Sequence, residues 1–151
     1  MGLKRTHMTL PYLAREFIIP LRPRPHIRST MGDGLLFRIP ENKLKPDSLK
    51  RKKQLERYND YKLDLADYCH RKRFKLPTGP MHVIFFLPMP KVWNRERKAS
   101  MNYRPHMVMP DTDNLFKALS DGLLERDQEI HDVRIQKVWI NDPDGWTSIQ
   151  Y

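Results

Sequence analysis

The feature that most constrains this fold is an apolar run near the middle of the chain, MHVIFFL at residues 81–87. The residues before it, PTGP at 77–80, break regular structure. A continuous apolar strand is typical of the centre of a sheet, where both faces are covered. At 151 residues the chain can bury a modest core of about two layers. We therefore predict an α+β fold, a small mixed β-sheet packed by about two helices, as a single domain over residues 1–151.

Further strands are predicted on both sides of this run. Residues 12–21, YLAREFIIPL, are rich in β-branched and aromatic residues and predict a first strand. The short run LLFRIP at 35–40 is predicted as an edge strand. Alternation from Val133 to Trp139 predicts another strand, and NDPDG is a turn signal. WTSIQY, at 146–151, is then expected to be its hairpin partner.

Two helices are predicted from apolar residues that recur at spacings of three and four. The first begins near Pro46 and runs for about five or six turns, with a stripe formed by Leu55, Tyr58, Lys62, Leu65 and Cys69. The second has an apolar face formed by Leu115, Phe116, Leu119 and Leu123.

Charge is unevenly distributed along the chain, whose formal net charge is +10. Residues 111–144 hold nine acidic and four basic residues, a balance of −5, which leaves +15 on the remainder. Such an excess indicates a polyanionic partner, nucleic acid before anionic membrane, although a merely solubilising basic surface is the alternative. The apolar runs are too short to span a membrane, and the N-terminus lacks the features of a secretory signal. We therefore expect a cytoplasmic protein without a membrane partner.

Basic residues are concentrated in two irregular stretches. Prolines at 20, 23 and 25 set an extended path that displays Arg22, Arg24 and Arg28 to phosphates, or to solvent as a basic linker. A long loop or distorted hairpin is expected at 88–111. There, basic residues alternate with Trp93 and Tyr103, a pattern that suits a nucleic-acid groove but also a mobile basic flap. Its basic residues are Lys91, Arg95, Arg97, Lys98 and Arg104.

Asp111 and Asp113 lie two residues apart, directly after HMVMP and directly before the second predicted helix. In an extended backbone, residues i and i+2 point to the same side, so the two carboxylates can converge. Lys117 follows one helical turn later and can reach the same place. Mg²⁺ suits such a pair of hard oxygen ligands, whereas the alternative is that the acids only cap the helix. Spacing alone leaves the third acid open between Asp127, Glu129 and Asp132.

The stretch PDTDNLFKALSDGL, followed by RDQEIHDVRIQKVW, resembles the RusA-type Holliday-junction resolvases, particularly phage and prophage members. The similarity spans about residues 80–140, and the block P-D-x-D-N-L-x-K is far more specific than a lone DxD. The resemblance implies metal ligation by Asp111, Asp113 and Asp127, with Lys117 as the essential lysine and Lys137 as the lysine of the following strand. Arg126 departs from the family pattern, which has an acid there. Asp121 matches a family position but is expected to be structural.

The resemblance thus implies an endonuclease that resolves four-way DNA junctions by paired incisions and uses Mg²⁺, for which Mn²⁺ could substitute. It also implies a homodimer and residence in a bacterial or phage-infected cell. Two other functions are kept open, a related branch or flap nuclease and a non-catalytic DNA-binding accessory protein.

The six histidines are left without a role, His131 being the best alternative among them. The basic residues expected to contact DNA are Arg22, Arg24, Arg28, Lys91, Arg95, Arg97, Lys98, Arg104 and Lys137.

Overall fold

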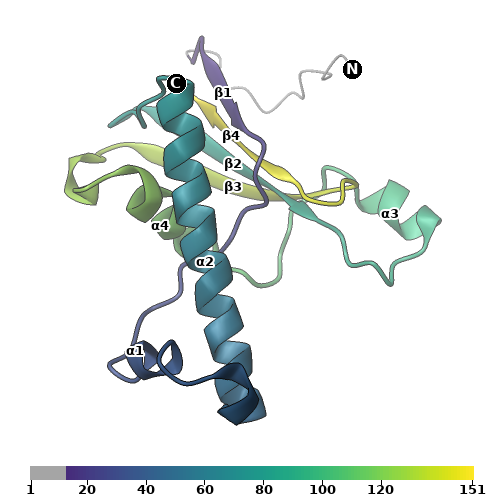
Figure 1. Cartoon of the computed structure of the whole chain (residues 1–151). Helices are drawn as coiled ribbons and strands as arrows, with labels where there is room; N and C mark the ends of the chain where they lie inside the picture. Colours follow the sequence, from purple (N-terminus) through teal and green to yellow (C-terminus); the bar gives the residue numbers. More distant parts are fainter. Residues whose placement is uncertain (1–12) are drawn as a thin grey trace.

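The computed structural model describes residues 13–151, which contain a four-stranded sheet in the order β1-β4-β2-β3 (Figure 1). β4 is antiparallel to both β1 and β2, whereas β2 and β3 are parallel. The expected mixed sheet in an α+β fold is therefore confirmed. Its strands are β1 (Glu16–Ile19), β2 (Met81–Pro88), β3 (Val133–Ile140) and β4 (Trp146–Gln150).

β2 has the central place predicted from its apolar run. Every residue from 81 to 87 is buried, and successive side chains enter different clusters on the two faces. Phe85 packs in the larger cluster, beneath the helices, and Phe86 packs in the smaller one with Trp146. Because parallel strands need a long crossover, β2 and β3 are joined by residues 89–132. That crossover contains α3 (Arg95–Met101) and α4 (Thr112–Leu123).

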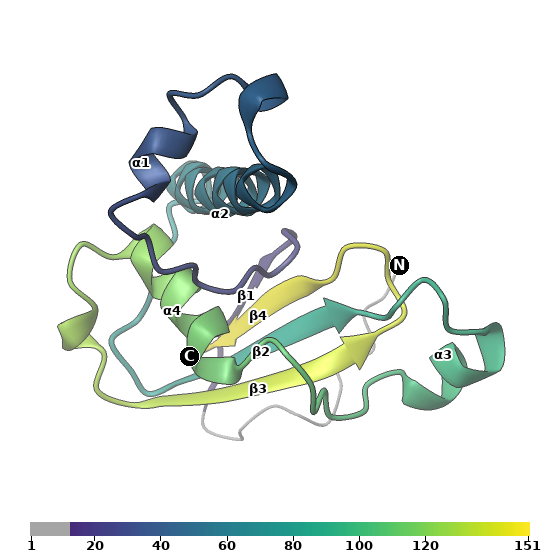
Figure 2. The same ribbon diagram turned by 90° about the horizontal axis from the view of Figure 1, so that it is seen from below.

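α2 (Pro46–Arg71) and α4 cover the same face of the sheet (Figure 2). α2 begins at Pro46 as predicted, and its 26 residues make about seven turns, more than expected. Its buried stripe contains Tyr61 where the sequence suggested Lys62, whose ammonium instead lies 4.5 Å from the ring centroid of Tyr58. No helix in residues 13–151 is long and apolar enough to cross a membrane.

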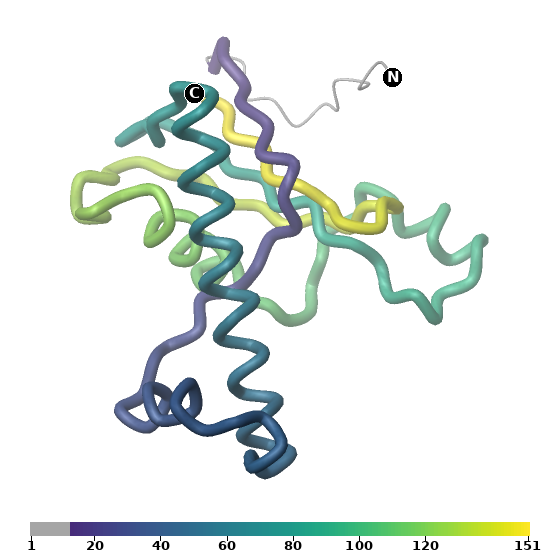
Figure 3. The backbone as a smooth tube through the Cα atoms, viewed as in Figure 1, coloured from purple at the N-terminus to yellow at the C-terminus, as the bar shows by residue number. Residues whose placement is uncertain are grey.

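The edge strand predicted at residues 35–40 is wrong. The chain there forms a helical turn, α1 (Asp33–Leu36), and then the 3-10 turn η1 (Glu41–Lys43). The buried carboxylate of Asp33 accepts from Thr30 N at 2.7 Å and pairs with Arg51 of α2 at 2.9 Å. These bonds dock the segment on α2, away from the sheet, and Figure 3 shows the chain leaving β1 and running along α2 to reach it.

β4 is not the hairpin partner of β3, although a short turn connects the two strands. Asp142 Oδ1 accepts from the amides of Asp144 and Gly145 in that turn, which confirms the NDPDG signal. β4 then pairs with β2 and β1, because β2 lies between it and β3. The apolar β2 thereby gains a strand on each edge. The first predicted strand is confirmed at Glu16–Ile19, whereas residue 12 lies outside the described residues.

Candidate active site

The edge strand β3 holds the segment that leads into α4. The amide of His106 donates to the carbonyl oxygen of Lys137 at 3.0 Å. The ammonium of Lys137 donates in turn to the carbonyl oxygens of Val108 and Pro110, the latter at 2.6 Å. The backbone immediately before Asp111 is therefore tied to the sheet. This contact gives Lys137 a structural role beside the DNA contact predicted from sequence.

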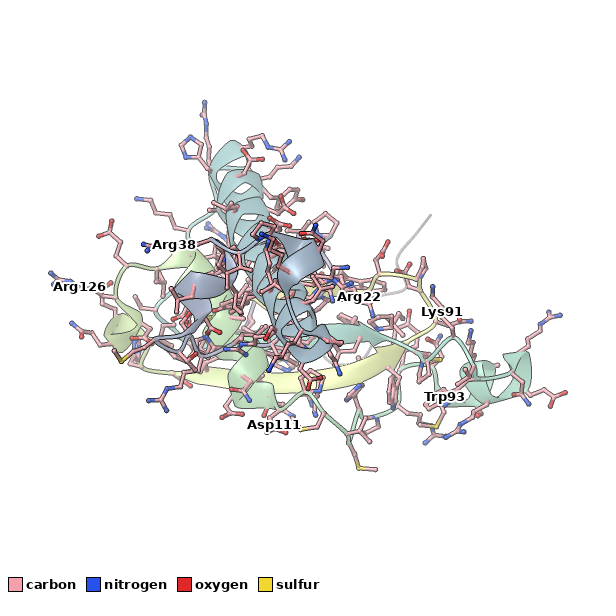
Figure 4. The ribbon with its side chains drawn as sticks, turned by 60° about the horizontal axis from the view of Figure 1, so that its bottom comes forward. Arg22, Arg38, Lys91, Trp93, Asp111 and Arg126 are labelled. Carbon is pink, nitrogen blue, oxygen red and sulfur yellow. The ribbon has the colours of Figure 1, made fainter. Side chains whose placement is uncertain are left out.

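Asp111 precedes the first residue of α4 in an extended conformation, and Asp113 lies in the first helical turn. The extended path expected through both acids therefore ends at Asp111, because the helix begins at Thr112. Both residues are exposed, and Figure 4 shows Asp111 at the surface where α4 begins. The side chain of Asp111 does not cap the helix, and neither carboxylate bonds to another described residue. The alternative that the Asp111 side chain caps the helix is therefore not what the structure shows.

Lys117 projects from the next turn of α4 toward two other acids. Its Nζ lies 3.1 Å from Asp121 Oδ1 and 3.5 Å from Asp127 Oδ2. The hydrogen bond to Asp121, and then the charge of that carboxylate, raise the pKa of Lys117. The ammonium therefore stays charged at neutral pH. From the sequence, Lys117 was expected to reach Asp111 and Asp113, whereas in the structure it contacts Asp121, one turn further along α4, and Asp127, after the helix.

Asp127 lies after α4 and contacts Lys117 of that helix. It begins η2 (Asp127–Glu129), the 3-10 turn that follows α4, and its carbonyl accepts from the amide of Ile130 at 3.1 Å. Of the three acids left open by spacing, this one contacts Lys117, and Glu129 and Asp132 do not within the described chain. Arg126, the departure from the family pattern, is exposed and projects away from Asp111 in Figure 4.

The three predicted ligands, Asp111, Asp113 and Asp127, are not gathered around one point. No three His, Cys, Asp or Glu side chains within residues 13–151 are grouped closely enough to hold one. Asp111 and Asp113 nevertheless offer the oxygen donors that Mg²⁺ prefers, and this ion often takes one or two carboxylates and keeps water elsewhere. Asp127 is bonded to Lys117 instead. The donor types fit, and the gathering of all three acids stays a prediction.

Asp121 has more contacts than its expected structural role suggested. Its second oxygen lies 3.2 Å from Nδ1 of His26, and the same nitrogen lies 2.9 Å from the hydroxyl of Tyr58 on α2. Burial, followed by the charge of Asp121, raises the pKa of Tyr58 to about 12. Sequence reasoning missed this network. Only the spacing of four between Lys117 and Asp121 could have indicated part of it.

The basic segment at 88–111 is not a plain loop. It contains α3, whose N-terminus is capped by Asn94, the side chain of which accepts from the amide of Arg97 at 2.9 Å. The guanidinium of Arg97 lies 4.1 Å from the ring centroid of Trp93. Three of the predicted DNA-binding residues, Arg95, Arg97 and Lys98, thus come from one short helix. The loop prediction failed because the side-chain cap at Asn94 starts a helix there.

The structure brings some of the predicted DNA-binding residues together. Arg22, Lys91 and Lys98 line one cavity of about 300 Å³ beside the ends of β2 and β3. Figure 4 shows Arg22 and Lys91 on the same side of the molecule. Arg24 lines a different cavity, against α2. Arg28 and Arg104 are exposed and line neither one.

The model of the family Endodeoxyribonuclease RusA matches residues 39–146, which include α2, the acidic sites and the basic helix α3. The chain belongs to the RusA family. It is therefore an endodeoxyribonuclease, a hydrolase of DNA, and its family acts on Holliday junctions with the help of metal ions.

The RusA match extends further toward the N-terminus than the resemblance seen in the sequence, which began near residue 80. It leaves β1 and the stretch that carries Arg22, Arg24 and Arg28 outside. No curated protein and no solved structure matched the chain. Membership of a nuclease family favours the enzyme over the non-catalytic accessory protein.

Proposed function

We propose that this RusA protein is a metal-dependent resolvase that cuts two opposed strands of a four-way DNA junction and acts as a homodimer in a bacterial or phage-infected cell. The observation that carries this proposal is the contact of Lys117, in the middle of α4, with Asp127, which follows the end of that helix. It joins the motif P-D-x-D-N-L-x-K to the acid after the helix, within the part of the chain that matches the family.

In this proposal Asp111, Asp113 and Asp127 hold Mg²⁺, or Mn²⁺ as a substitute. When bound, the metal would supply Lewis acidity at the scissile phosphate and a more acidic water. Asp111 and Asp113 carry the ligand oxygens, and the hydrogen bonds from Lys137 to Val108 and Pro110 hold the backbone that presents them. The start of a helix also favours their negative charge before any cation arrives.

Lys117 places a positive charge beside the acids. Its bonds to Asp121 and Asp127 fix the position of the ammonium, and its raised pKa keeps it charged. A charge held in place stabilises the negative charge that develops on the phosphate oxygens during cleavage, without the cost of reorganising side chains. None of the histidines is needed as a base in this scheme.

DNA binding is assigned to the basic surface outside the acidic segment. Arg22, Lys91 and Lys98 surround one cavity, and Arg95 and Arg97 lie on the same short helix as Lys98. Such groups neutralise phosphates and therefore make the affinity salt-dependent. A four-way junction has approximate two-fold symmetry, so a homodimer would present one site to each of the two cut strands.

The test uses purified protein with a mobile four-way junction, a flap, a nicked duplex and a linear duplex, in Mg²⁺, Mn²⁺ or chelator. We expect symmetric cuts in the junction only, and none in chelator. The substitutions Asp111→Asn, Asp113→Asn and Asp127→Asn should each slow cutting by at least ~100-fold while junction binding persists.

Asp64→Asn, an exposed acid on α2, is the matched control and should cut at the wild-type rate. Preferential cutting of the flap would identify the related branch nuclease instead. Wild-type rates in all three substituted proteins would overturn the assignment of the site. Sedimentation of the protein alone and with the junction reports on the homodimer, and a strict monomer in both conditions contradicts it.

A further inference from the structure

A second basic cavity, of about 320 Å³, lies between the proline-rich stretch after β1 and helix α2. The stretch is held there by His26, whose amide donates to Asn114 O of α4 at 2.9 Å and whose ring contacts Tyr58 of α2. Figure 3 shows this segment running beside α2. The cavity is lined by Arg24, Pro25, Ile27, Gln54, Arg57 and Tyr58.

Two guanidinium groups face this cavity without a carboxylate partner. Neither Arg24 nor Arg57 forms an ion pair within the described chain. Arg51, which lies on the same helix, differs because it binds both Asp33 and the carbonyl oxygen of Arg28. The donors of Arg51 are thus already used in hydrogen bonds within the fold, whereas the side-chain donors of Arg24 and Arg57 remain available.

The positive charges of Arg24 and Arg57 lie close to each other at one partly buried cavity. Burial, followed by the charges of Arg22 and Arg57, lowers the pKa of Arg24, and the charge of Asp144 opposes this only in part. Like charges held together are relieved when an anion binds between them. The planar guanidinium suits a phosphate oxygen pair particularly well.

We propose that this cavity binds a phosphate group, held by Arg24 and Arg57 with Gln54 as a further donor. Pro25 and Ile27 form an apolar wall beside it, which strengthens the charge interactions by excluding water. The inference rests on the proposed function only for the origin of the phosphate, which we assign to the DNA backbone.

The cavity is also connected to the candidate active site. Tyr58 lines it and bonds to His26, which contacts Asp121, the partner of Lys117. A phosphate bound here therefore lies within a short chain of contacts from the catalytic lysine. It would belong to the same DNA molecule as the phosphate that is cut, and it would fix the register of that molecule on the enzyme.

The first experiment measures junction affinity by fluorescence anisotropy in chelator, where no cutting occurs, over a series of salt concentrations. We expect Arg57→Gln to weaken binding by roughly fivefold or more and to lower the slope of log affinity against log salt by about one. Gln54→Glu, which puts an acid in the cavity, should weaken binding further. Circular dichroism checks that both variants are folded.

Arg71→Gln is the matched control. It removes the same charge from the same helix, about 21 Å farther along its axis, where Arg71 pairs with Asp67 at 3.0 Å on the surface. We expect its affinity and salt slope to equal those of the wild type. If Arg57→Gln and Arg71→Gln weaken binding equally, the effect is one of general charge and the cavity is not a phosphate site.

A second experiment separates the sources of phosphate and does not depend on DNA. Inorganic phosphate is titrated into the full-length protein, and NMR follows the Nε–Hε signals of Arg24 and Arg57. Saturable shifts at these two signals, absent at Arg71, support the site. If they occur while Arg57→Gln leaves junction binding unchanged, the ligand is a free phosphate compound rather than DNA.

The absence of saturable shifts, together with an unchanged salt slope in Arg57→Gln, would overturn the phosphate site. A wild-type protein that binds no junction contradicts the proposed function instead. In that case the phosphate titration still decides whether the cavity binds an anion.

Discussion

The ammonium of Lys137 on β3 lies 2.6 Å from the carbonyl oxygen of Pro110, the residue before Asp111. A second hydrogen bond reaches the carbonyl oxygen of Val108. A side chain of the sheet thus fixes the backbone from which the acidic motif extends.

Lys137→Met should impair cutting more than DNA binding. The substitution keeps the length of the side chain but removes both side-chain hydrogen bonds that hold the backbone before Asp111 against β3. We expect the maximal cutting rate at saturating junction to fall by ~10-fold or more, in addition to the loss of affinity that removal of one DNA contact brings. Lys91→Met is the control. It also removes one positive charge, but Lys91 does not hold the backbone before Asp111, so this substitution should weaken affinity only. An unchanged maximal rate in Lys137→Met would make this residue a DNA contact alone.

Asp121→Asn should reduce the maximal cutting rate, because it weakens the bond that positions Lys117. The amide oxygen of Asn can still accept from the ammonium, but the attraction between opposite charges is lost. We expect a ~10-fold lower rate at saturating junction and unchanged affinity, with partial recovery in Asp121→Glu. A merely structural residue behaves differently: the melting temperature falls and the rate of the folded fraction does not.

The ion pair of Asp33 and Arg51 should be visible in acid unfolding. Hydrogen bonds from Arg51, and then from the Thr30 amide, lower the pKa of Asp33 to about 2. The folded protein therefore holds this proton less tightly than the unfolded chain, and the contribution of Asp33 to stability is present above about pH 4 and lost as the pH falls toward 2.

Urea unfolding at a series of pH values measures the effect. Arg51→Met should remove much of the fall in the free energy of unfolding between about pH 4 and pH 2. Arg71→Met, at an exposed ion pair of the same helix, should leave it in place. Parallel curves for wild type and Arg51→Met would show that Asp33 does not contribute in this range.

Gly145→Ala should destabilise the turn between β3 and β4. Gly145 has a φ of 72°, and a Cβ there would lie 2.1 Å from the carbonyl oxygen of Phe86. The strained conformation alone costs about 1–3 kcal/mol, and the backbone clash adds to it. Gly34→Ala is the control, because nothing lies within 4 Å of its Cβ and the residue is helical. It should be neutral or slightly stabilising in thermal unfolding, and an equal loss in both variants would contradict the explanation.

The sequence by itself determined the central strand, the two main helices and the position of the acidic motif. A continuous apolar run identified β2, and apolar residues at spacings of three and four identified α2 and α4, because burial on one or both sides leaves a local pattern in the order of apolar residues. The position of Asp111, Asp113 and Lys117 could be predicted for the same reason, since Asp111 directly precedes α4 and the other two lie in its first two turns. Their catalytic roles stay a prediction.

The tertiary structure decided what depends on residues far apart in the chain. β4 lies between β1 and β2, so β2 has β4 on one edge and β3 on the other. The short turn that connects β3 to β4 does not reveal this order. The helical turn at Asp33 depends on Arg51, eighteen residues later. Likewise, only folding brings His26 and Tyr58 to Asp121, and Arg24 to Arg57. Contacts of this kind leave no periodic pattern in the sequence, because the packing of whole elements against one another decides which residues meet.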